Sequence, residues 1–134
     1  SGTVPWILKK GGLGVSTAIH TGTEPIIGSS FADFLLMFEK DQQTLAVAAF
    51  GEIGGSQEEE AAEVIKAGKF TKPFVIYIAG AAAPEGQRFS HASAIIERGR
   101  GTVQGKVKAL REAGAYPVET PKDIVPTLKK LLNL

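Results

Sequence analysis

Three short apolar runs each lead into a glycine-containing turn, and this repeated order restricts the chain to few folds. The runs cover residues 15–20, 45–50 and 74–79, and helical spacings of apolar residues lie between and after them. In the third run, side chains on both faces of the pleat are apolar, which is typical of strands that are covered on both sides. The alternation of strand and helix patterns therefore predicts an α/β fold, with a mostly parallel sheet and helices on both faces.

Local signals place the helix ends. Gly114 stops the third helical pattern, and Thr120 followed by Pro121 opens the last one. Pro126 lies inside that last pattern, so we expect it to kink the helix or to move its start. Together, the patterns predict helices over residues 31–40, 57–67, 103–113 and 121–132, and a short strand over 116–118.

The second helix begins with a run of acidic residues. Ser56 and Glu59 have the spacing of a capping box, in which each side chain bonds to the backbone N–H of the other residue. Glu58 and Glu60 add negative charge at the positive end of the helix dipole. A metal site is the alternative interpretation of these acids, and we favour the helix start.

Size and composition exclude several classes of function. A chain of 134 residues with 43% apolar residues is expected to form a single domain over residues 1–134. Lysine and arginine number 15 against 14 acidic residues, which gives no charge excess for nucleic acid. The chain contains no cysteine, and no apolar stretch approaches the length of a membrane span. We expect a soluble protein of the cytoplasm, or of the mitochondrial matrix in a eukaryote. Since the sequence begins without methionine, we also expect that it is a piece of a longer polypeptide.

His91 is the candidate nucleophile. It follows residues 80–90, and a connection of that length with little regular structure is more often functional than not. The residues after it favour a short helix, whose free N–H groups would stabilise a phosphoryl group on the ring. An ordinary surface histidine is the alternative that the position alone leaves open.

Glu52 is the candidate partner of His91. It follows the apolar run 45–50 after Gly51, and sites in parallel sheets form beyond the carboxyl ends of strands. A carboxylate that accepts from one ring nitrogen would leave the other nitrogen free to attack phosphorus. The alternative is a turn residue that only satisfies backbone donors. Glycines would let backbone N–H groups approach the phosphate, and the predicted phosphate loop consists of Gly51, Gly54, Gly55 and Ser90.

Other candidate groups carry no predicted chemistry. We interpret His20, at the end of the first run, as a partly buried residue bonded to loop backbone. With two histidines in the chain and no metal-like spacing to carboxylates, we expect no metal site.

Ordered motifs along nearly the whole chain resemble one family, the succinyl-CoA synthetase α subunit in its C-terminal domain, together with related acyl-CoA synthetases. The motifs are Gly12-Leu13-Gly14, Glu24-Pro25-Ile26, Met37-Phe38-Glu39-Lys40-Asp41, Gly51-Glu52-Ile53-Gly54-Gly55-Ser56, Glu58-Glu59-Glu60-Ala61-Ala62, Tyr77-Ile78-Ala79-Gly80, His91-Ala92 and Gly101-Thr102.

The resemblance implies a fold and a reaction. It implies a flavodoxin-like domain in which a nucleoside triphosphate phosphorylates His91 and Glu52 orients the ring. The phosphohistidine would then pass its phosphoryl group to succinate or another small carboxylic acid, and coenzyme A would displace phosphate from the acyl phosphate. Ser90 and Ser93 stand where the family usually has glycine, which places the loop conformation and the acid specificity in question.

The resemblance also implies partners. A β subunit with an ATP-grasp domain and an N-terminal CoA-binding domain would supply the sites for magnesium-bound ATP or GTP and for coenzyme A, which this domain itself is not expected to bind. The isolated chain is therefore expected to be inactive. A flavodoxin-like module that binds a ligand without covalent chemistry, and a regulatory or assembly domain, are the competing interpretations. The acid, the nucleotide and the oligomeric state are not fixed by the sequence.

Overall fold

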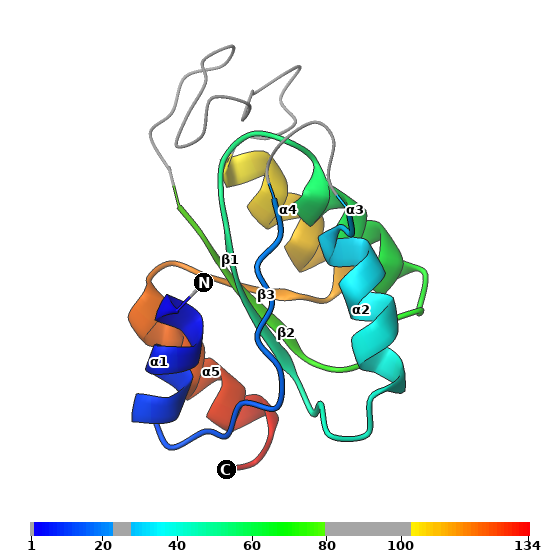
Figure 1. Ribbon diagram of the computed structural model, residues 1–134. Helices are drawn as coiled ribbons and strands as arrows, with labels where there is room; N and C mark the ends of the chain where they lie inside the picture. The colour runs from blue at the N-terminus through cyan, green and yellow to red at the C-terminus, as the bar shows by residue number, and fades with distance from the viewer. Residues whose placement is uncertain (1, 23–27, 80–102) are drawn as a thin grey trace.

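The computed structural model describes residues 2–22, 28–79 and 103–134 (Figure 1). Its sheet is parallel, and within the described residues it contains β1 (Val47–Gly51), β2 (Phe74–Ile78) and β3 (Tyr116–Val118) in that order. β1 pairs with β2 from Val47 opposite Phe74 to Gly51 opposite Ile78. β3 pairs with the other edge of β2. The carboxyl ends of β1 and β2 therefore lie at the same edge of the sheet.

Helices cover both faces of this sheet. On one face, α2 (Phe31–Lys40), α3 (Gln57–Lys66) and α4 (Val103–Ala113) pack against one another in that order. On the other face lie α1 (Thr3–Lys10) and α5 (Ile124–Leu131), which is preceded by a short 3-10 turn, η1 (Pro121–Asp123). The described elements thus form an α/β arrangement in three layers, as predicted (Figure 1).

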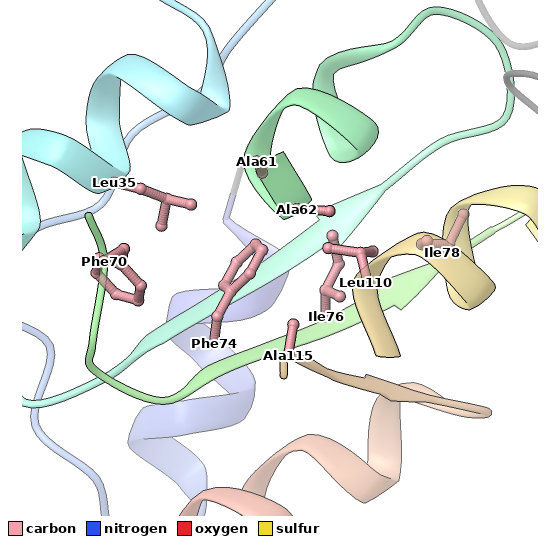
Figure 2. Close-up of a cluster of buried hydrophobic side chains, with 9 residues drawn as sticks. All are labelled: Leu35, Ala61, Ala62, Phe70, Phe74, Ile76, Ile78, Leu110 and Ala115. Carbon is pink, nitrogen blue, oxygen red and sulfur yellow. The ribbon is translucent and has the colours of Figure 1, made fainter. Parts of the chain in front are cut away.

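Alternation along β2 divides the core in two. Phe74, Ile76 and Ile78 face the α2, α3 and α4 layer, where Ile76 packs near Leu110 of α4 (Figure 2). Val75, between them, faces α5 and is fully buried. Since successive side chains of a strand point to opposite faces, a strand covered on both faces must be apolar throughout. This two-sided burial explains the continuous apolar run 74–79.

Hydrogen bonds between Glu39 and Thr71 fix the end of α2. Thr71, in the loop before β2, donates from its backbone N–H to Glu39 Oε1 at 3.1 Å and from its hydroxyl to Oε2 at 2.8 Å. These hydrogen bonds from Thr71 lower the pKa of Glu39, mainly through the backbone donor. The carboxylate thereby ties α2 to the connection between α3 and β2.

The predicted elements after residue 30 are largely confirmed. The helices 31–40 and 103–113 and the strand 116–118 have the expected bounds. Gly114 ends α4 with φ +99°, and Thr120 forms a capping box with Asp123. The last pattern is divided into η1 and α5, so that Pro126 falls in the first turn of the α-helix, where a missing N–H is tolerated.

The predicted strand over residues 15–20 is wrong. This run has no regular secondary structure and forms no ladder with the described strands. Val15 and Ile19 remain 40% and 44% exposed. The run and β1 both line a cavity of about 700 Å³. A strand needs a neighbouring strand to accept and donate its backbone hydrogen bonds. An apolar pattern does not show whether such a neighbour is present, so it does not by itself predict a strand.

No helix in the described part of the chain has both the length and the apolar character needed to cross a membrane.

We predict that Leu110→Ala lowers the free energy of unfolding by about 2–5 kcal/mol, because Leu110 is fully buried between α4 and the sheet. Leu45→Ala is the matched control, since Leu45 is 67% exposed and its truncation is expected to change stability by less than about 0.5 kcal/mol. Urea unfolding followed by circular dichroism measures both. Equal losses in the two variants would contradict the assignment of the core.

A second prediction concerns pH. Because the pKa of Glu39 is lower in the folded state, its contribution to stability is present above the unfolded pKa and is lost as pH falls through the folded pKa. Glu39→Gln should therefore flatten the loss of stability in acid between about pH 5 and pH 3. Denaturant titrations at several pH values measure this slope. Glu63→Gln, at an exposed site on α3, is the control and should keep the pH dependence of the parent chain. If Glu63→Gln flattened the pH dependence and Glu39→Gln did not, the contribution of the Glu39–Thr71 hydrogen bonds would be refuted.

Candidate functional site

The candidate site lies at the edge where β1 and β2 end. Gly51 is the last residue of β1, and Glu52 follows it directly. Ala79, the residue after β2, donates from its N–H to the Gly51 carbonyl at 3.0 Å. The chain therefore leaves β2 beside Glu52, and from there it continues into the segment that contains His91.

Glu52 sits at the first position of a glycine-rich turn. Its backbone N–H donates to Glu58 Oε1 at 3.2 Å, and its side-chain Oε2 is shielded from solvent. A Cβ added at Gly51 would lie only 2.7 Å from the same Glu58 oxygen. A larger residue at the end of β1 would therefore force the Glu58 side chain to shift.

The remainder of the turn combines a buried anchor with two unusual backbone conformations. Ile53 is buried, with 4% of its side chain exposed. Gly54 and Gly55 have φ angles of +86° and +66°, a region that favours glycine strongly. The role of Gly51, Gly54 and Gly55 in holding a phosphate stays a prediction.

A buried ionic cluster supports this turn. Lys106 of α4 is fully buried, and its ammonium lies 2.5 Å from Glu58 Oε2 and 3.0 Å from Glu59 Oε1. The same ammonium donates to the carbonyl of Gly55 at 3.2 Å. The cluster connects α3, α4 and the Gly51–Gly55 turn.

This cluster corrects the prediction for the start of α3. Ser56 makes no side-chain cap, and its hydroxyl donates instead to Glu60 Oε1 at 2.7 Å. Glu59 is turned inward to Lys106, so the predicted capping box does not form. The ammonium offers a charge-assisted partner that a backbone N–H cannot match. Sequence analysis missed Lys106, although it lies on the apolar stripe of its helix, three residues after Val103 and four before Leu110.

Other predicted residues differ in their outcomes. His91 and Ser90 lie outside the described residues. His20 is exposed rather than partly buried.

The side chain of Gln57, the first residue of α3, donates to the carbonyl of Gly22 and accepts from the N–H of Phe31. Gly22 thus lies near the end of β1, at the predicted edge.

Within residues 2–22, 28–79 and 103–134, no group of three or more histidine, cysteine, aspartate or glutamate side chains has the geometry to hold a metal ion.

Known proteins similar to this chain include subunits of ADP-forming acid–CoA ligases. The chain is 49% identical to the α subunit 1 of an ADP-forming succinate–CoA ligase of Archaeoglobus fulgidus over 94% of its own length and 43% of that protein. It is 47% identical to a subunit of an ADP-forming sulfoacetate–CoA ligase of Bilophila wadsworthia, again over 94% of this chain and 43% of the relative. The chain therefore spans less than half the length of these relatives.

A solved structure agrees in fold. The ATP citrate lyase of Methanosaeta concilii, in complex with (3S)-citryl-CoA, superposes with a TM-score of 0.74 at 30% identity, over 84% of this chain and 19% of that one. The CoA-ligase family matches residues 4–116. With most of its length matched, and with relatives in ligases of two different acids, this chain belongs to the CoA-ligase family.

Proposed function

We propose that this chain is the phosphohistidine-carrying domain of an ADP-forming acid–CoA ligase, with His91 as the phosphoryl acceptor and Glu52 as the carboxylate that orients its ring. The observation that carries the proposal is the position of Glu52 at the carboxyl edge of a parallel sheet, beside the point where the chain leaves β2 toward His91. Sites in such sheets form at this edge. Membership in the CoA-ligase family supports the same reaction class.

The proposed reaction divides one condensation into three balanced transfers. A ring nitrogen of His91 attacks the γ-phosphorus of ATP, the bond to the bridging oxygen breaks, and ADP leaves. A carboxylate oxygen of the acid then attacks the phosphohistidine, which gives an acyl phosphate and frees the imidazole. The thiolate of coenzyme A attacks the acyl carbon last, and inorganic phosphate leaves with the electron pair of the broken bond. Each step exchanges one bond for another, which is the advantage of covalent catalysis.

The role of each group follows from its chemistry. A neutral imidazole attacks only through a nitrogen without a proton, so the other nitrogen must keep its proton. The carboxylate of Glu52, with Oε2 shielded from water, is an acceptor for that proton-bearing nitrogen. The N–H groups of the Gly54 and Gly55 turn provide donors for phosphoryl oxygens. In this proposal the chain holds the nucleophile, and it does not itself bind the nucleotide base or coenzyme A.

The names of the relatives narrow the substrates. Both are called ADP-forming, which favours ATP over GTP as the phosphoryl donor. Succinate and sulfoacetate share a carboxylate and a second anionic group, so we propose a small dianionic acid. In the whole enzyme, a nucleotide-binding β subunit and a CoA-binding domain are the proposed partners.

We predict that the complete subunit, assembled with its nucleotide-binding partner, takes up radiolabel from γ-labelled ATP and Mg²⁺ in an acid-labile, base-stable form. His91→Asn should abolish the label while circular dichroism shows an intact fold. His20→Asn is the matched control and should label like the parent. Label that persists in His91→Asn would refute the proposal, as would a parent protein that binds a ligand stoichiometrically without labelling.

A separate prediction tests Glu52. Replacing it with glutamine removes the charge that fixes the ring, so the rate of His91 phosphorylation at saturating ATP should fall by at least about 10²-fold. Rapid-quench labelling in a single turnover measures this rate. Glu112→Gln, an exposed carboxyl on α4, serves as the control and should leave the rate unchanged. If Glu52→Gln were labelled as fast as the control, the orienting role of Glu52 would be refuted and it would be a turn residue only.

A further inference from the structure

Lys106, Glu58 and Glu59 form a cluster whose composition needs an explanation. The lysine is 0% exposed, and the two glutamates are 5% and 9% exposed. Burying such charges carries a desolvation cost, and replacing a buried ion pair by apolar side chains is often neutral or stabilising. Stability alone therefore gives little reason for an ammonium and two carboxylates in this position.

The contacts of the cluster point to the turn above it. Glu58 uses one carboxylate oxygen for the backbone N–H of Glu52 and the other for Lys106. Lys106 in turn donates to the carbonyl of Gly55. One ion pair thus binds the first and the last part of the segment that carries the proposed orienting carboxylate.

The turn needs such support because of its composition. Gly54 and Gly55 have no side chains that could lock their backbone, and glycine has the largest conformational freedom of any residue. Charge-assisted hydrogen bonds are roughly twice as strong as neutral ones and restrict direction. The Glu58 carboxylate lies in the space that a side chain at position 51 would fill. The ion pair is therefore positioned to restrict the backbone on which Glu52 stands.

We propose that Lys106 and Glu58 are positioning residues, which hold the Gly51–Gly55 turn so that Glu52 is presented in one orientation. The proposal rests on the proposed function of Glu52. Lys106 touches neither substrate nor nucleophile in this account, and it acts through the turn. Glu59 contacts the same ammonium, so that Lys106 pairs with two carboxylates.

The first test reads the turn directly in the 134-residue chain. In Lys106→Met, amide hydrogen exchange of residues 51–55 should accelerate at least about tenfold, because the Gly55 carbonyl loses its donor and the Glu58 carboxylate, which accepts from the Glu52 N–H, loses the cation that holds it. Lys108→Met, an exposed position on the same helix, is the control and should exchange like the parent. Unchanged exchange in a folded Lys106→Met would overturn the proposal regardless of the enzymatic reaction.

The second test is a double-mutant cycle on the phosphorylation rate in the assembled enzyme. Lys106→Met should lower the single-turnover rate by about 10- to 100-fold, with the half-saturating ATP concentration unchanged, because a small displacement of an orienting group is costly. In a Glu52→Gln background the same substitution should have little further effect, since Lys106 acts through Glu52. Equal rate losses in both backgrounds would show a general structural role and refute positioning.

A third variant keeps the proposal testable when Lys106→Met does not fold. Lys106→Met combined with Glu58→Gln and Glu59→Gln leaves no unpaired buried charge, so it is expected to fold. It should show the same rate loss and the same dependence on Glu52, and a rate equal to that of the parent would overturn the proposal. A parent enzyme that never labels His91 identifies failure of the proposed function, and the positioning role then falls with it, whatever the exchange result.

Discussion

The parallel pairing of β1 with β2 determines where the chemistry of this chain can lie. Because the strands run in the same direction and are covered on both faces, their carboxyl ends share one open edge. Glu52 follows one strand at that edge, and the path toward His91 follows the other. The residues that directly follow β1 and β2 therefore leave the sheet at the same edge, although they are far apart in the sequence.

The second determinant is electrostatic. A fully buried lysine and two buried glutamates lie directly under the glycine turn, in a layer that is otherwise apolar. The acids occupy the first turn of α3, where the helix dipole also favours negative charge. The two determinants are complementary, because the sheet places Glu52 at the edge and the cluster restricts how the turn holds it.

Most of the fold followed from local patterns, and the exceptions have physical causes. Helices 31–40 and 103–113 were predictable because their apolar residues recur at helical spacing between clear end signals. Residues 15–20 have a strand-like composition, but pairing depends on a neighbour that a sequence window does not contain. The turn with Glu52 was recognisable from its glycines. Lys106 was not, since a lysine on an apolar stripe is ordinarily taken for a surface residue, and only its long-range partners reveal its role.

The role proposed for Glu52, to hold the imidazole of His91 in one tautomer, is open to direct measurement by NMR. The chain contains two histidines, so ¹⁵N–¹H correlation spectra of its rings are readily assigned with His91→Asn. If Glu52 orients the ring, His91 has a single neutral tautomer in the parent chain and a mixture of tautomers in Glu52→Gln, and the signals of His20 are unchanged. Identical ring spectra for His91 in both proteins would contradict this role.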